Sequence, residues 1–234
     1  MVRITCAALM IATACLYFTN SGAADVQGDN QKCVRNLKGI ALALAEHEAV
    51  NGTLPAAFSV DKGGKPLLSW RVHILPFLGH SPLYQRFHLD EPWDSPHNKA
   101  LIKFMPAAYA CPGENRKLVR EGKTSYLAPR GPATVFPGAE PVSSDQITDG
   151  RPNTALIVEA SDAAAVIWTK PEDWNVGGEP KARALFGRHP RGTHFLIADG
   201  SVHFIKASTK PEDLKARFTR NGNEVIEEVI RDAF

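Results

Sequence analysis

Two short apolar runs on either side of Asp199-Gly200 constrain the fold of this chain more than any other feature. The runs, residues 193–198 and 201–205, are rich in the β-branched and aromatic side chains that are typical of strands. An Asp-Gly pair between two such runs favours a tight turn, because both central positions of a type I′ turn need a positive φ. The sequence therefore predicts a β-hairpin with Asp199 and Gly200 as its two-residue loop.

A two-residue loop also predicts how the strands pair. Counting outward from the turn, Phe195 lies opposite Phe204 and Ile197 lies opposite Val202, so these four side chains share one face. That face needs an apolar partner, because an isolated hairpin is only marginally stable in water. The other face is expected to be half exposed. It carries His194, Leu196 and His203.

The N-terminus has the pattern of a secretory signal peptide. Arg3 precedes an apolar run from Ile4 to Phe18, and small residues follow at Ser21 to Ala24. The run is shorter than the roughly 20 residues that a membrane-spanning helix needs. We therefore expect residues 1–24 to be removed, the mature protein to be periplasmic or extracellular, and no stable membrane span to remain. A retained N-terminal anchor is the alternative.

The mature chain, residues 25–234, is long enough for one domain with its own core, and no clear boundary divides it. Its prolines and glycines predict long irregular loops, notably at residues 91–98 and 129–141. The formal charge of +2 is spread among acidic residues, so nothing indicates the clustered basic face of a nucleic-acid-binding protein. The sequence does not indicate an oligomeric state.

Apolar residues recur at helical spacing from Val34 to Ala45, with charged residues between them. This pattern predicts an amphipathic helix over about Gln31 to Val50 that ends at Asn51-Gly52, a favourable C-cap pair. A polar stretch, Asn20 to Lys32, is expected to separate this helix from the N-terminal apolar run.

Cleavage of the signal peptide would leave Cys33 and Cys111 as the only cysteines. An even pair in an exported protein favours a disulfide, although two unrelated buried thiols would give the same count. A zinc site built on these cysteines is not expected, because there is no C-x-x-C spacing and no histidine pair close to them in the sequence.

Four histidines, His73, His189, His194 and His203, could approach one another near the hairpin. A metal site needs three or four convergent ligands, so we expect instead that these side chains are exposed or hydrogen-bonded locally. Turn chemistry already explains Asp199. Because the common catalytic and phosphate-binding motifs are absent, we expect no catalytic residue, no cofactor, no metal and no enzymatic activity.

His189, nine intervening residues and then Asp199-Gly200 form an H-x9-D-G motif. Several further stretches, in order from Cys33 to the C-terminus, accompany it. They are residues 33–44, 67–78, 91–98, 109–112 and 147–160. On these residues the chain resembles a planctomycete family of unknown function that carries this C-terminal motif and is prepilin-type and pseudopilin-like.

The resemblance implies an α+β fold in which the N-terminal helix lies across an antiparallel sheet. It also implies a disulfide, since a cysteine at the position of Cys111 commonly accompanies one at the position of Cys33 in that family. A non-enzymatic structural, secretion-linked or surface-interaction role follows, with envelope or secretion-system proteins as partners. The polar stretch before Lys32 departs from the continuous apolar helix of prepilins, which argues against pilus assembly.

An extracytoplasmic module that binds a ligand or a glycan is the alternative function, and an exported hydrolase is less favoured. Aromatic side chains provide flat apolar faces on which a sugar or another ring can stack. The candidate platforms are Trp70, Trp93, Trp168 and Trp174. Convergence of these rings on one exposed cleft would favour the binding module, and burial in the core would favour a structural role.

Overall fold

The computed structural model describes residues 21–111, 116–177, 185–189 and 191–224, with side chains described from Asn30 onward. The expected signal peptide lies almost entirely outside these residues. The central sheet has four antiparallel strands in the order β10-β9-β6-β4. These strands are β4 (Tyr126–Leu127), β6 (Ala155–Glu159), β9 (Gly192–Ile197) and β10 (Val202–Lys206).

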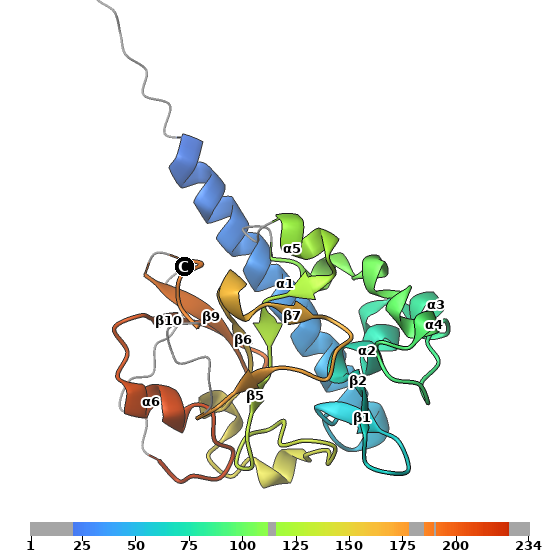
Figure 1. The fold of residues 1–234 in the computed structure, drawn as a ribbon. Helices are drawn as coiled ribbons and strands as arrows, with labels where there is room; N and C mark the ends of the chain where they lie inside the picture. The colour runs from blue at the N-terminus through green and yellow to red at the C-terminus, as the bar shows by residue number, and fades with distance from the viewer. Residues whose placement is uncertain (1–20, 112–115, 178–184, 190, 225–234) are drawn as a thin grey trace, which may run out of the picture.

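Helix α1 (Ser21–Asn51) runs along one side of this sheet, as Figure 1 shows. Leu37, Ile40 and Leu44 recur on one side of the helix and are buried in the main core. Gly52, at a φ of +76°, follows the helix, and its N–H donates to the carbonyl of Glu48 at 2.8 Å. The predicted α+β fold with an N-terminal helix on an antiparallel sheet is confirmed.

The start of α1 differs from the expectation. Within the described residues the helix extends back to Ser21, so residues 21–32 are helical and continuous with the amphipathic part, and the apolar run before them lies outside the described residues. This stretch contains no proline, and a helix anchored by packing extends at little cost once its first turn exists. The N-terminal turns project beyond the sheet and loops (Figure 1). No helix in the described part of the chain is both long and apolar enough to span a membrane.

The hairpin is present, but its predicted register is wrong by one residue. Val202 pairs with Leu196, His203 with Phe195, and Phe204 with His194. The loop therefore contains three residues, Ala198 to Gly200: the N–H of Gly200 donates to the carbonyl of Ile197, and the N–H of Ile197 donates to the carbonyl of Ser201, both at 2.9 Å. This pattern is a type I turn followed by a glycine in the left-handed region.

Asp199 explains why the two-residue loop does not form. Its φ is not positive, whereas a type I′ turn requires a positive φ at both central positions. Its carboxylate oxygen Oδ1 accepts hydrogen bonds from the N–H and the hydroxyl of Ser201, at 2.9 and 2.6 Å. These local bonds favour the longer loop.

Gly200 has a φ of +86°, which confirms that the turn requires a residue tolerant of the left-handed region. We expect Gly200→Ala to lower the free energy of unfolding by about 1 kcal/mol through backbone strain. Gly138→Ala is a matched control, because Gly138 has no positive φ and an added Cβ there meets no atom within 4 Å. Urea unfolding of both variants measures the difference. Equal midpoints would contradict the assigned loop.

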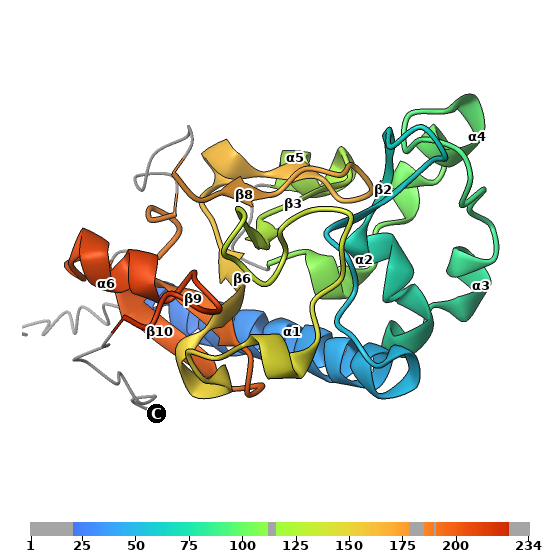
Figure 2. The ribbon, with the colours of Figure 1, turned by 90° about the horizontal axis from the view of Figure 1, so that it is seen from below.

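Both faces of the hairpin are buried, so the expectation of one half-exposed face is also wrong. Leu196, Ala198 and Val202 join the core that contains α1. The alternate side chains, including Phe195 and Ile205, pack in a second core with residues of the C-terminal segment. That segment contains helix α6 (Pro211–Ala216), which lies beside β9 and β10 in Figure 2. Within the two strands, Phe204 is partly exposed and Lys206, at the end of β10, is exposed.

The rest of the chain forms short elements around this layer. Along the chain, α1 is followed by short elements: β1 (Phe58–Val60), β2 (Pro66–Ser69), α2 (Trp70–His73), η1 (Leu75–Leu78), α3 (Ser81–Tyr84), α4 (Pro96–Lys99), η2 (Ile102–Phe104), η3 (Ala107–Tyr109) and α5 (Arg116–Arg120). Later come the 3-10 turns η4 (Ser144–Gln146), η5 (Arg151–Asn153) and η6 (Asp162–Ala164). Strands β3 (Lys123–Thr124) and β7 (Val166–Ile167) pair antiparallel, whereas β5 (Pro129–Arg130) and β8 (Trp174–Asn175) form one short parallel pair.

A buried ion pair joins α2 to the segment that precedes β8. Arg71 contacts the Oδ1 atom of Asp173, and neither side chain is exposed. The guanidinium also donates through Nε and Nη2 to the carbonyl of Tyr126, at 3.2 and 2.8 Å. Asp173 Oδ1 accepts further hydrogen bonds from the N–H of Ala128 at 2.9 Å and from Trp70 Nε1 at 3.3 Å. The pair thereby connects three segments that lie far apart in the sequence.

Candidate functional site

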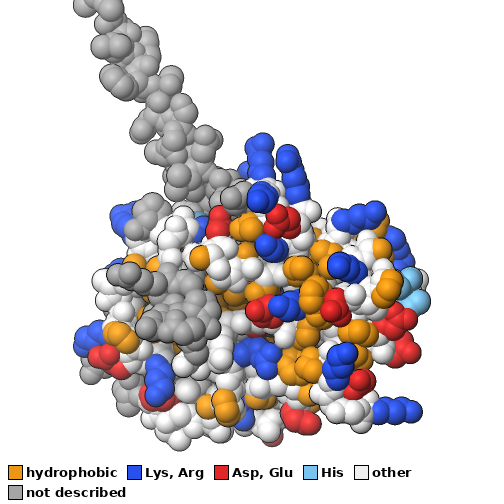
Figure 3. Space-filling model, viewed as in Figure 1, with side chains coloured by type: hydrophobic (Ala, Val, Ile, Leu, Met, Phe, Trp, Pro, Cys, Tyr) orange, Lys and Arg blue, Asp and Glu red, His pale blue; other side chains and the backbone are white. Residues whose placement is uncertain are grey.

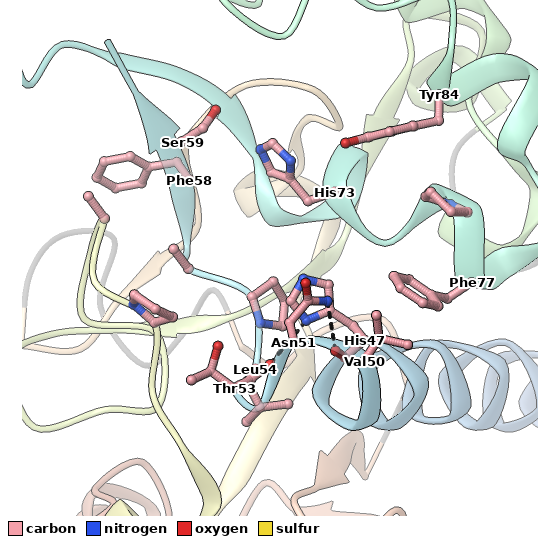
Figure 4. Close-up of a pocket in the computed structure, with 15 residues that line it drawn as sticks. His47, Val50, Asn51, Thr53, Leu54, Phe58, Ser59, His73, Phe77 and Tyr84 are labelled. Atoms are coloured by element: carbon pink, nitrogen blue, oxygen red, sulfur yellow. Dashed lines mark hydrogen bonds between the residues drawn. The ribbon is translucent and has the colours of Figure 1, made fainter. Parts of the chain in front are cut away.

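A groove of about 540 Å³ opens between the C-terminal end of α1 and the α2–α3 segment. Figure 4 shows side chains from both segments, and from the loop after α1, directed around this space. Aromatic rings, prolines and short hydrogen-bonding side chains line it, and none of the lining residues is Lys, Arg, Asp or Glu. The members labelled in the figure are His47, Val50, Asn51, Thr53, Leu54, Phe58, Ser59, His73, Phe77 and Tyr84.

Local sequence positions both walls of the groove. Gly52 ends α1, and the following chain is held by hydrogen bonds from the N–H of Leu54 to the carbonyl of Val142 and from the N–H of Ala57 to that of Gly138. Ser69 caps the opposite wall at the start of α2, where its hydroxyl accepts from the N–H of Arg71. The groove is therefore preformed by backbone contacts.

Two histidines face the groove in their neutral form. Burial lowers the pKa of His73 to about 4, and burial also lowers the pKa of His47. His47 contacts the carbonyl of Thr53 through Nδ1 at 3.1 Å and the ring of Phe77 edge-on. The Nε2 atom of His73 is buried without a hydrogen-bond partner. At neutral pH the described lining of the groove therefore carries no formal charge.

The lowered pKa of His73 predicts a pH dependence. An unfolded histidine has a pKa of about 6.5, so above that pH His73 is neutral in both states and its titration costs no stability. As the pH falls from about 6.5 toward 4, the unfolded state binds a proton that the folded state does not, and the free energy of unfolding decreases by up to about 3 kcal/mol. Urea unfolding at pH 7 and pH 4.5 should show that the free energy of unfolding decreases less between these pH values in His73→Gln than in the natural sequence. Equal losses would mean that His73 does not titrate as a buried group.

The histidine of the C-terminal motif belongs to a different, buried cluster. Glu159, at the end of β6, is fully buried, and its Oε2 atom lies 3.0 Å from His189 Nε2 and 2.8 Å from His194 Nδ1. Burial alone would raise the pKa of Glu159, but the two histidine hydrogen bonds outweigh it and lower the pKa to about 2. His189 thus anchors its segment to the sheet, whereas Asp199 and Gly200 form the turn.

The structure separates the histidines that were expected near one another. His189 and His194 are neighbours, with ring centroids 4.9 Å apart. His203 is buried on the other face of the hairpin, with its Nε2 atom 2.9 Å from the hydroxyl of Ser201. His73 lies in the groove with His47. Sequence reasoning missed Glu159 and His47, although a carboxylate at the end of the apolar run 155–158 was a signal for the first.

Three of the four candidate stacking tryptophans are unsuitable for that role. Trp70 and Trp168 have no exposed surface and Trp174 is 5% exposed. Trp70 and Trp168 pack in the core against Tyr109, and Trp168 Nε1 donates to the carbonyl of Ile102 at 2.8 Å. Trp93 is partly buried, with the Lys170 ammonium 5.6 Å from its ring centroid. None of the four lines the groove.

The disulfide between Cys33 and Cys111 is present, with the two Cα atoms 5.3 Å apart, which confirms the predicted pairing. It connects α1, at Cys33, to the segment after η3. Asn36, one turn further along α1, supports the same contact by donating from Nδ2 to the carbonyl of Ala110 at 2.9 Å.

The family model described as "Protein of unknown function (DUF1559)" matches residues 30–179. The chain belongs to this family. The match covers α1 from Asn30 onward, the groove, the disulfide and Glu159, and it ends before His189, so the C-terminal motif lies outside it. No curated protein and no solved structure is significantly similar to the chain.

As a DUF1559 protein, the chain inherits no assigned activity, and its function has to be argued from its own surfaces. On the face shown in Figure 3, Lys and Arg side chains are interspersed with Asp, Glu and apolar side chains and form no continuous basic patch. The groove and the Glu159 cluster are therefore the two regions from which a specific role can be argued.

Proposed function

We propose that this protein is a non-enzymatic, exported, pseudopilin-like protein with a structural or surface-interaction role, and that its partners are other envelope proteins. The observation that carries the proposal is the arrangement of α1. Its C-terminal part packs on an antiparallel sheet, and its N-terminal turns project away from the domain (Figure 1). An N-terminal helix packed on an antiparallel sheet is the arrangement that the pseudopilin-like resemblance implies.

Two further features support export and the absence of catalysis. Disulfides persist mainly in oxidising compartments outside the cytoplasm, and Cys33 and Cys111 form one. General acid–base catalysis commonly uses titratable groups whose pKa values are matched to neutral pH. Burial instead lowers the pKa of both groove histidines, that of His73 to about 4, and no carboxylate is among the described residues that line the groove.

Intact-mass analysis and thiol titration of the protein purified from its native envelope test this proposal. We expect loss of residues 1–24 and no free thiol in the denatured, non-reduced protein. Affinity capture with that protein as bait should then recover other envelope proteins, including secretion-system components. Recovery of the protein in the cytoplasm with two free thiols would overturn the export proposal.

The groove favours a second candidate, a binding module for a neutral ligand. Aromatic faces combined with uncharged donors and acceptors suit a hydroxylated ring such as a sugar residue, since each ring edge can hydrogen-bond while a face stacks. Titration calorimetry with a panel of neutral methyl glycosides tests this role. Binding that is lost in Phe77→Ala and kept in Phe104→Ala, a change at an exposed ring outside the groove, would support it. No heat from any glycoside would count against it.

A further inference from the structure

Four potential metal ligands converge beneath α1 at Cys33. The sulfurs of Cys33 and Cys111, a carboxylate oxygen of Glu159 and a ring nitrogen of His189 all lie within 4.8 Å of one another. All four residues are buried. They come from α1, from the segment after η3, from the end of β6 and from the segment before β9, so no spacing in the sequence could have indicated the group.

Glu159 has coordination capacity that its neighbours leave unused. Both histidines contact Oε2, whereas Oε1 is buried and accepts no hydrogen bond. Oε1 forms a long ion pair with Arg188, whose Nε atom lies 3.8 Å away, beyond hydrogen-bond distance. A buried carboxylate oxygen that accepts no hydrogen bond from the protein is able to accept a further partner.

We propose that reduction of the Cys33–Cys111 disulfide converts this cluster into a tetrahedral site for a thiophilic divalent cation of the Zn²⁺ type. The four ligands would be two thiolates, the His189 imidazole and the Glu159 carboxylate. Because a zinc–sulfur bond is about 2.3 Å, two sulfurs on one tetrahedral ion lie about 3.8 Å apart. The Cα atoms of Cys33 and Cys111 are 5.3 Å apart, so rotation of the two side chains can bring the sulfurs to this separation of about 3.8 Å once the S–S bond has opened.

The conversion balances in electrons and protons. A dithiol reductant supplies two electrons and two protons, breaks the S–S bond to leave two thiols, and is itself oxidised to a disulfide. The cation then displaces the two thiol protons and any proton that His189 Nε2 shares with Glu159, and these leave to solvent. Reoxidation of the thiolates by a disulfide acceptor reverses the sequence and releases the cation.

Neighbouring groups fit a cation in this position. Two thiolates, one carboxylate and a divalent ion leave a net charge of −1, and the buried guanidinium of Arg188 lies beside Glu159. His194 would continue to hold Glu159 from outside the site, as second-sphere hydrogen bonds do for metal ligands in general. Thiolate and imidazole ligands favour Zn²⁺ or Co²⁺ over Mg²⁺ and Ca²⁺, which prefer oxygen.

Cobalt binding tests the proposal, because thiolate-bound Co²⁺ has a charge-transfer band in the near ultraviolet and tetrahedral Co²⁺ absorbs strongly in the visible. The chain with Cys6→Ser and Cys15→Ser, in which Cys33 and Cys111 are the only cysteines, is reduced with a phosphine under anaerobic conditions, and thiol titration verifies the reduction. We expect about one equivalent of Co²⁺ to produce both bands, and one equivalent of Zn²⁺ to abolish them. The oxidised chain should produce neither band.

Three histidine variants separate a built site from adventitious binding. His189→Gln should weaken Co²⁺ binding more than about 100-fold, His194→Gln about tenfold, and His203→Gln, on the other face of the hairpin, less than about twofold. Loss of folding on reduction is followed by circular dichroism. Recovery of the fold on adding Zn²⁺ would support the site, since a cation that binds only the folded state stabilises it. Absence of both bands, failure of Zn²⁺ to restore an unfolded reduced chain, or equal affinity in His189→Gln and His203→Gln would overturn the proposal.

Discussion

Replacing Asp173 with alanine is expected to lower the free energy of unfolding by about 3 to 5 kcal/mol. The change leaves the guanidinium of Arg71 without its counter-charge in a position where neither side chain has any exposed surface. It also removes the acceptor for the N–H of Ala128 and for the indole of Trp70. Most of the expected cost is therefore the penalty of an uncompensated buried charge, and little of it is the net value of the ion pair.

The neighbouring pair Lys170–Glu172 provides a matched control. Its charged atoms lie 2.5 Å apart, but the side chains are 39% and 49% exposed. Exposed ion pairs contribute little, so Glu172→Ala should change the stability by less than about 1 kcal/mol. Urea unfolding curves of both variants, fitted with a common slope, measure the two effects. An Asp173→Ala loss no larger than that of Glu172→Ala would mean that the buried network is not formed in solution.

Phe195→Ala is expected to cost about 3 to 5 kcal/mol, through lost burial and the cavity that remains. Phe195 has no exposed surface, and its ring centroid lies 5.6 Å from that of Phe218 in the C-terminal segment. The substitution would therefore disturb both the sheet and the C-terminal core beside it.

Phe204→Ala is the comparison that tests the register of the hairpin. Phe204 pairs with His194, is partly exposed and makes edge contacts with the rings of His189 and His194. Its replacement should cost about 1 to 2 kcal/mol. A two-residue loop would place Phe195 and Phe204 side by side in one core, so equal losses for the two variants would favour that register over the observed one.

Several elements could be predicted from the sequence because their causes are local. The Asp199-Gly200 pair between two apolar runs located the hairpin, and Gly200 has the expected positive φ. Helical spacing from Val34 to Ala45 predicted α1, and Gly52 marked its end. Turn chemistry and periodicity act over a few residues, so they can be recognised without knowledge of the partners that bury each element.

Other features were decided by tertiary structure, because they depend on residues brought together across long separations. Whether the second face of the hairpin is exposed depends on the C-terminal segment, which packs against Phe195 and Ile205. The tryptophans are ambiguous in the sequence, since an aromatic ring suits a core as well as a binding surface, and only packing places Trp70 and Trp168 inside.

The site residues show the same division. Family resemblance implied the pairing of Cys33 with Cys111, and the pairing is confirmed. That Glu159 and His189 lie against the two sulfurs could not be inferred from spacing, because the four residues come from four separate segments. A cluster of ligands needs side chains within a few ångströms in space, and only the packing of α1 against the sheet brings these four together.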